Sequence, residues 1–156
     1  MLLAVVQKYI IRQSAELPLT QITVQRLHTM LCGNLYSDAG RYRTHNVQLG
    51  FFEPPAYFDL SVLMKNWEDD LNLRLQGNQT TADEIDTCAW MMHRFLWIHP
   101  FFDYNGRIAR LLGEIYLIRR QLPIVDFQKT RRTDFVSAVK TATATGVLDA
   151  LKSLLG

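Results

Sequence analysis

Six residues that commonly bind phosphate, metal ions or protons lie within one twelve-residue stretch, HPFFDYNGRIAR at positions 99–110. They are His99, Asp103, Asn105, Gly106, Arg107 and Arg110. A histidine can take a proton from a hydroxyl at neutral pH, and an aspartate can bind Mg²⁺ beside the oxygens of a phosphate. An arginine grips phosphate oxygens with two parallel hydrogen bonds. This combination is what phosphoryl or nucleotidyl transfer requires.

The order of these residues indicates how the chain would position them. Pro100 cannot continue a helical hydrogen-bond ladder, so the apolar helix before it is expected to end there. The next helix is expected to begin near Asn105 and Gly106, with Asn105 as its cap and with room for a phosphate oxygen against the Gly106 backbone. Its first amides would favour an anion. Arg107 and Arg110 would share one face of the first turn, where positive charge opposes the helix dipole unless an anion binds.

Each of these residues also has an ordinary structural explanation as a cap or a packed side chain. The presence of all six in this order favours a functional site over a polar turn. Other candidates are weaker, because His28, His45 and His93 have no zinc-ligand spacing with His99. The arginines of RYR at 41–43 could contact a phosphate, but their default location is the solvated surface.

Helical periodicity dominates the rest of the chain. Apolar spacing and end signals predict helices at residues 1–13, 21–32, 57–76, 81–98, about 105–120, about 131–143 and about 146–155. The turn-rich segment 33–46 is expected to be a loop, and VQLGFFEPP at 47–55 has the β-like character of a small hairpin or flap. The sequence therefore predicts an all-α fold, a compact helical bundle with a small β-hairpin flap.

The composition is that of an ordinary globular protein. The chain has 156 residues, 48% of them hydrophobic and 21% charged, which fits one domain with a substantial core. The net charge of +2 is too small to indicate a nucleic-acid binder. No apolar run reaches the ~18 residues that a membrane span requires. Residues 1–13 carry their basic residues after the apolar run, so we expect an amphipathic helix and not a signal peptide.

The cysteine content indicates a reducing compartment. Cys32 and Cys88 lie within apolar helical patterns and have no ligand-like spacing, so both are expected to be reduced and structural. We therefore expect a cytoplasmic protein, or one delivered into the cytosol of a host cell if it is an effector.

The stretch HPFFDYNGRIAR resembles the signature of Fic-domain proteins, H-x-F-x-[D/E]-G-N-G-R-x-x-R, at every position but one. The resemblance extends to LHTML, to GRYRTHNVQLGFFEPP, to the helix that ends in FLWIHPF and to RLLGEIYLIRRQLP, all in the family's usual order. It implies a single Fic domain over residues 1–156, with a core at about 20–155 and an N-terminal helical extension at 1–19.

Most members of that family attach AMP from ATP to a Ser, Thr or Tyr hydroxyl of a target protein. The resemblance implies that His99 is the general base and that Asp103 holds Mg²⁺ on the α- and β-phosphates. It assigns the phosphates to four further residues: the α-phosphate to Asn105 and Gly106, the β-phosphate to Arg107 and the terminal phosphates to Arg110. It also implies that a flap aligns the target segment by strand-like backbone pairing. The flap residues are Val47, Gln48, Leu49, Gly50, Phe51 and Phe52.

Two positions of the motif distinguish this chain within the family. Tyr104 stands where most members have Gly. Because related branches carry Ala there, a left-handed backbone is not expected to be obligatory, and the side chain is expected to point to solvent or to pack on the flap. Gly106 favours AMP transfer over phosphorylation, since a branch of toxins that phosphorylate their targets has Lys at this position.

Regulation and two alternative functions stay open. Many members carry an inhibitory helix with the motif [S/T]-x-x-x-E-[G/N], which is absent here, because QSAEL at 13–17 has the wrong spacing. Inhibition is therefore expected from an antitoxin partner or from a helix outside this sequence. The same site could instead remove AMP or transfer another nucleotide or phosphate-containing group. A different class of function is a catalytically weak interaction module, if Tyr104 spoils the site.

Overall fold

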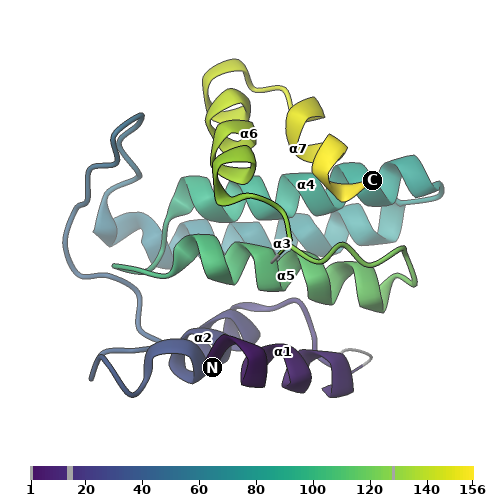
Figure 1. Cartoon of the computed structure of the whole chain (residues 1–156). Helices are drawn as coiled ribbons and strands as arrows, with labels where there is room; N and C mark the ends of the chain where they lie inside the picture. Colours follow the sequence, from purple (N-terminus) through teal and green to yellow (C-terminus); the bar gives the residue numbers. More distant parts are fainter. Residues whose placement is uncertain (1, 14–15, 128) are drawn as a thin grey trace.

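The computed structural model describes residues 2–13, 16–127 and 129–156. The helices of these residues follow the order seen in Figure 1. They are α1 (Leu2–Gln13), α2 (Gln21–Cys32), the 3₁₀ turn η1 (Tyr57–Asp59), α3 (Leu60–Gly77), α4 (Thr81–Ile98), α5 (Asn105–Arg119), α6 (Arg132–Thr145) and α7 (Asp149–Leu155). The predictions for 21–32 and 81–98 are confirmed residue for residue. The other helices lie within three residues of their predicted bounds, although Met1 of the first one falls outside the described residues.

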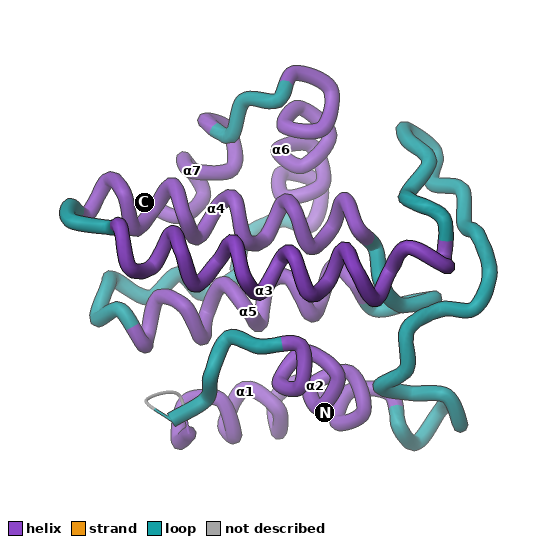
Figure 2. The backbone as a smooth tube through the Cα atoms, turned by 180° about the vertical axis from the view of Figure 1, so that it is seen from behind, coloured by secondary structure: helices purple, strands orange, loops and turns teal. Residues whose placement is uncertain are grey.

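The helices form three layers. In Figures 1 and 2, α3, α4 and α5 lie side by side, with α1 and α2 on one side of them and α6 and α7 on the other. Helix α4 packs against α3, α5, α6 and α7, whereas α5 packs against α1, α2 and α4. The loop between α4 and α5 is therefore held by the two most extensively packed helices.

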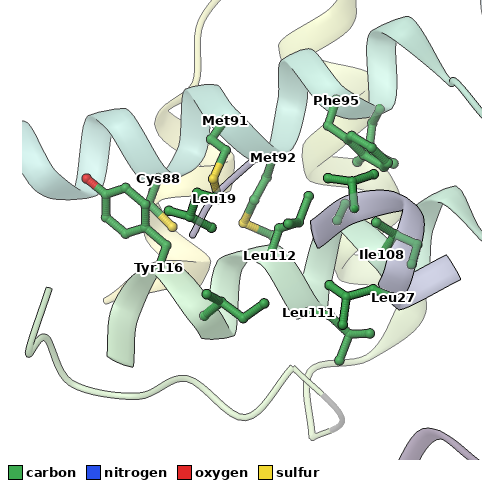
Figure 3. Close-up of a cluster of buried hydrophobic side chains, with 14 of the residues drawn as sticks. Leu19, Leu27, Cys88, Met91, Met92, Phe95, Ile108, Leu111, Leu112 and Tyr116 are labelled. Carbon is green, nitrogen blue, oxygen red and sulfur yellow. The ribbon is translucent and has the colours of Figure 1, made fainter. Parts of the chain in front are cut away.

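The core is centred on the contact between α4 and α5. Figure 3 shows Met91, Met92 and Phe95 of α4 beside Ile108 and Leu112 of α5, and all five are 0% exposed. Burial of one such side chain contributes roughly 1.5–3 kcal/mol. This packing makes the α4–α5 pair a rigid support for the polar loop at its end.

Local signals define the ends of α4. Thr80 accepts a hydrogen bond from the Asp83 N–H (3.1 Å), and the Asp83 carboxylate accepts one from the Thr80 N–H (2.9 Å), which is a capping box. At the other end His99 adopts a left-handed conformation with φ 53°, and Pro100 follows. Helix α4 thus stops where the proline predicted.

The predicted β-hairpin flap at residues 47–55 is wrong, because none of the described residues forms a strand. A hydrogen bond from the Leu49 N–H to the Phe52 carbonyl (3.1 Å) closes a turn, and the Gln48 side-chain amide also donates to the Leu49 carbonyl (3.0 Å). The two prolines that follow have no N–H with which to extend a ladder, and an isolated two-stranded pair is marginal in water. The segment is an extended loop that turns at its tip.

Two expectations from composition concern cysteines and membranes. Cys32 and Cys88 are buried and free, as expected. Within the part of the chain that the structure describes, no helix combines the length and apolar character needed to cross a membrane.

Candidate functional site

The loop between α4 and α5 reverses the chain between two left-handed residues, His99 (φ 53°) and Tyr104 (φ 69°). A side chain in this conformation costs about 1–2 kcal/mol, because Cβ crowds the following carbonyl. We did not expect a left-handed backbone to be required at Tyr104, yet the structure has one there. Contacts around the loop must therefore stabilise its shape.

Asn105 closes the loop with its side chain. Its Oδ1 accepts a hydrogen bond from the Phe101 N–H (3.0 Å), and its Nδ2 donates to the Phe101 carbonyl (2.8 Å). The expectation that Asn105 caps α5 is wrong, because Tyr104 occupies the cap position and makes no side-chain cap. Asn105 is the first residue of the helix and is 2% exposed. Its buried amide shapes the loop, and the first amides of α5 receive no side-chain cap.

His28 of α2 supports the same loop from below. The Gly40 N–H donates to its Nδ1 (2.8 Å), so Nε2 carries the ring hydrogen and donates to the Asp103 carbonyl (3.1 Å). The ring also stacks on Phe101, with centroids 3.8 Å apart and planes 8° apart. Burial lowers the pKa of His28, which keeps the ring neutral. His28 is thus a structural histidine that connects α2 to the motif.

His99 lines the cavity beside α5. Burial, together with the nearby guanidinium of Arg43, lowers the pKa of His99 to about 4, so the ring is neutral at pH 7. The Leu96 carbonyl and Asp103 act in the opposite direction. Nδ1 is buried and, among the described residues, has no hydrogen-bond partner, and the Leu96 carbonyl is the backbone group that acts on this ring. Nε2 is therefore the nitrogen that can face the cavity.

The two motif arginines flank the first turn of α5. The guanidinium of Arg107 lies over the ring of Tyr104, 4.7 Å from its centroid, and is exposed. Arg110 is half-buried, and its Nε donates to the Gly106 carbonyl (3.1 Å). Burial lowers the pKa of Arg110, and the nearby charges of Arg107 and Arg132 lower it further. A cluster of like charges beside a helix N-terminus favours a bound anion.

A cavity of about 760 Å³ opens at this end of α5. Its polar wall includes the motif, Glu114 and Arg132, and its apolar wall includes Leu3 of α1 and Val136 and Val139 of α6. A Cβ added to Gly106 would meet no atom within 4 Å, so the space in front of this residue is open. The volume lies within the range of about 300–1,000 Å³ that is typical of small-molecule sites. A nucleotide is of suitable size and charge for it.

Tyr104 also lines this cavity, in contrast to the expectation that it would point to solvent or pack on the flap. Its ring contacts Tyr36 and His28 edge-on, with centroids 6.4 Å apart in both cases, and carries the Arg107 guanidinium on its face. A stacked guanidinium keeps its in-plane N–H groups free for phosphate oxygens. The ring therefore supports Arg107 at the edge of the cavity.

Glu114 is a buried acid in the cavity wall, one helical turn beyond Arg110. Gln7 of α1 donates to both of its carboxylate oxygens, at 3.2 and 3.4 Å. Burial raises the pKa of Glu114 to about 7, and the hydrogen bond from Gln7 opposes this effect. The carboxyl group therefore titrates near neutral pH.

Asp103 is exposed at the cavity edge, and its Oδ1 accepts a hydrogen bond from the Tyr104 N–H (2.7 Å). The described residues contain no group of three or more acidic, histidine or cysteine side chains that would enclose a metal ion. Mg²⁺ at nucleotide sites needs no such cage, because one carboxylate and the phosphate oxygens suffice. The second Asp103 oxygen fits that donor set.

The flap residues divide into two groups. Leu49, Phe51 and Phe52 line the cavity, whereas Val47, Gln48 and Gly50 do not contribute to its wall. The Lys140 ammonium of α6 lies 5.4 Å from the Phe51 ring centroid, which links the loop tip to the far wall. The predicted flap thus reaches the site even though it has no strand.

Three residues of this region were missed by the sequence analysis. His28 and Glu114 sit at apolar-face positions of their helices, which is the one signal that could have marked them as buried. Arg43 was expected on the surface, but it is 4% exposed and its side chain bonds to backbone carbonyls. Nothing in the local sequence distinguishes it from the exposed Arg41.

Comparison with known proteins identifies relatives of this chain. A model of the Fic/DOC family matches residues 18–117. The chain is 31% identical over 128 residues to the protein adenylyltransferase Fic of Drosophila willistoni, a match that covers 81% of this chain and 25% of that protein. The chain thus spans about a quarter of the length of the curated relatives it matches.

Solved structures show the same fold. A Fic domain containing signaling protein from Bacteroides thetaiotaomicron has a TM-score of 0.79 at 24% identity, covering 98% of this chain and 60% of that one. The BepC protein of Bartonella tribocorum, solved with bound AMPPNP, has a TM-score of 0.74 at 16% identity. That match covers 98% of this chain and 83% of BepC.

Proposed function

This chain belongs to the Fic/DOC family, and on that premise we propose that it transfers AMP from ATP to a hydroxyl group of a target protein. The observation that carries the proposal is one cavity in which the uncapped N-terminus of α5, a neutral histidine and two arginines meet. The curated relatives are named protein adenylyltransferases, which supports the same reaction.

In this proposal the phosphates of ATP bind at the N-terminus of α5. The amides of the first turn and the open space before Gly106 receive the α-phosphate, and Asn105 acts by fixing the loop through Phe101. Arg107, held by the Tyr104 ring, and Arg110 bind the outer phosphates. Asp103 would hold Mg²⁺, which when bound neutralises phosphate charge.

His99 acts as the general base. With Nδ1 carrying its hydrogen toward the Leu96 carbonyl, Nε2 keeps a lone pair that faces the cavity. It takes the proton as the hydroxyl oxygen attacks the α-phosphorus, the bond from the α-phosphorus to the bridging oxygen breaks, and pyrophosphate leaves. A pKa of about 4 is low for a base at pH 7, but the negative charge of bound phosphates raises it.

The target segment is proposed to lie along residues 47–52. Leu49, Phe51 and Phe52 bring this loop to the cavity, so a hydroxyl presented by an extended target segment would reach His99. Backbone groups of an extended loop can pair with such a segment. Inhibition by an antitoxin partner or by a further helix also stays a prediction.

Labelling with ATP tests the reaction. Wild-type protein and the His99→Ala variant are incubated with Mg²⁺, lysate proteins and ATP labelled at the α- or the γ-phosphate. We expect protein-bound label from the α-phosphate only, and its loss in His99→Ala. Label from the γ-phosphate only would mean phosphorylation. No label from either phosphate, with ATP still bound, would favour the alternative function of a catalytically weak interaction module. The observation that supports this alternative is the Tyr104 ring in the cavity wall.

A further inference from the structure

Arg43 is a buried arginine whose side chain bonds only to carbonyl oxygens among the described residues. Its guanidinium donates through Nε to His99 (2.8 Å), through Nη1 to His45 (3.0 Å), and through Nη2 to Pro55 (2.7 Å) and Ile98 (3.3 Å). It is 4% exposed, and no carboxylate of the described residues forms an ion pair with it. Burial lowers its pKa.

The acceptors belong to segments that border the cavity on two sides. Ile98 and His99 form the C-terminal end of α4, where the proposed base sits. The flap loop here means residues 47–52; His45 lies two residues before it and Pro55 three residues after it. The Arg43 backbone adds a fifth bond, because its N–H donates to the Pro100 carbonyl (2.8 Å).

A buried cation without a counter-ion is costly, and several hydrogen bonds must offset its lost hydration. An apolar side chain here would leave these carbonyl oxygens without the donors that the guanidinium supplies, so the position requires a side chain with several N–H groups. The planar guanidinium fixes the directions of its donors, whereas a lysine ammonium is a single point on a flexible stem. The geometry is suited to setting the relative placement of several backbone carbonyls.

The His99 backbone needs such support. Its left-handed conformation costs about 1–2 kcal/mol for a non-glycine residue, and its carbonyl accepts the bond from the Arg43 Nε. The same guanidinium holds both ends of the loop that carries Leu49, Phe51 and Phe52. The Arg43 side chain therefore links His99, the proposed base, to the flap loop.

We propose that Arg43 is a positioning residue that fixes the position of His99 relative to the flap loop on the opposite side of the cavity. The purpose of this arrangement rests on the proposed function: it would place the target hydroxyl next to the His99 ring. The nucleotide phosphates depend on α5 instead, which Arg43 does not contact through any of the bonds described above.

The first test needs no variant and no activity. The Nε–H exchange of arginine side chains with solvent is measured by NMR in the wild-type protein. We expect Arg43 to exchange at least about tenfold more slowly than the exposed Arg41, because its Nε–H is buried and bonded. Equal exchange rates for the two arginines would overturn the proposal.

The second test compares Arg43→Lys with Arg41→Lys as the matched control. Arg43→Lys keeps the positive charge but removes the directed N–H donors of the guanidinium. The rate of amide hydrogen exchange should therefore rise at least about tenfold both in the flap loop and at residues 99–103. Arg41→Lys should leave these rates unchanged. Faster exchange in only one of these segments, or in neither, would contradict the proposal that Arg43 holds both of them. If Arg43→Lys fails to fold, the wild-type exchange measurement decides.

The third test measures the transfer reaction. Arg43→Lys should lower kcat for the target by at least about tenfold and leave the Kd for AMPPNP within about threefold of wild type, because the phosphate ligands lie on α5. Equal losses in nucleotide affinity and kcat would contradict a positioning role. A wild-type protein that transfers no AMP would refute the proposed function, while the exchange measurements would still decide the role of Arg43.

Discussion

At position 104 a tyrosine adopts a backbone conformation that glycine adopts without strain, and its ring supports Arg107 beside the cavity. The tyrosine thus has two opposite effects on the stability of the loop. The left-handed backbone destabilises the loop, and the ring adds contacts with Tyr36 and His28.

Comparing Tyr104→Gly with Tyr104→Ala isolates the backbone effect. Both variants lose the ring, but only alanine keeps a Cβ in the left-handed region, so the glycine variant should be more stable by about 1 kcal/mol. Urea unfolding at pH 7 measures the difference. An alanine variant as stable as the glycine variant would show that the loop relaxes out of the left-handed conformation.

Glu114 predicts a pH dependence of stability. Because burial raises its pKa from 4.5 to about 7, the folded protein keeps a proton that the unfolded chain releases near pH 4.5. The contribution of Glu114 to the free energy of unfolding therefore falls as the pH rises from about 4.5 through about 7, by up to about 3 kcal/mol. Glu114→Gln should remove this slope and exceed the wild type in stability at pH 8.

The control for this prediction is Glu53→Gln, since Glu53 is an exposed acid. It should follow the wild-type curve from pH 4 to pH 8 in urea unfolding. If Glu114→Gln also follows that curve, then the acid is ionised in the folded protein at neutral pH and its hydrogen bond from Gln7 outweighs its burial.

Helix α5 organises the site as an element. Its first turn presents uncapped amides and two arginines, and one turn later Glu114 faces α1. Helix α2 contributes through His28, which bonds the Asp103 carbonyl from below. The loop between α4 and α5 therefore depends on a residue of α2, since His28 precedes Asp103 by 75 positions in the sequence.

His28→Ala should lower the free energy of unfolding by about 3 kcal/mol. The substitution leaves a cavity beside Phe101 and removes the partners of the Gly40 N–H and the Asp103 carbonyl. His45→Ala is the control, because the exposed His45 side chain should contribute no more than about 0.5 kcal/mol. Similar urea midpoints for the two variants would refute the supporting role of His28.

The elements themselves were largely predictable from the sequence, and their long-range contacts were not. The ends of α4 follow from Thr80, Asp83 and Pro100, which act within a few residues of themselves. The Arg43 side chain bonds to carbonyls up to 56 residues away, so its burial has no local signal. The absent strands of the flap have the same cause, because pairing depends on partners that periodicity does not reveal.

The motif residues line one cavity, and their spacing indicates that they lie together, since a proline, a loop and a helix start fix their order. Their individual tasks were less predictable. Asn105 bonds to Phe101, and Tyr104 takes the cap position in a left-handed conformation that tyrosine rarely adopts.

At the scale of the whole molecule, the cavity is assembled from every layer. Leu3 comes from α1, the motif from the end of α4, the following loop and α5, and Val139 from α6, while the flap loop contributes Leu49, Phe51 and Phe52. The residues matched by the family model, 18–117, thus supply the end of the cavity that we propose binds phosphate, and helices outside that range complete the apolar wall.

The most direct measurement is a calorimetric titration of AMPPNP into the wild-type protein, Arg110→Ala and Arg26→Ala, whose exposed arginine lies outside the cavity wall. We predict one site per chain, a Kd raised at least about tenfold by Arg110→Ala, since charge-assisted hydrogen bonds contribute about 1.5–3 kcal/mol, and no change in Arg26→Ala. No binding by the wild type, or equal affinity in Arg110→Ala, would contradict a nucleotide site at the N-terminus of α5.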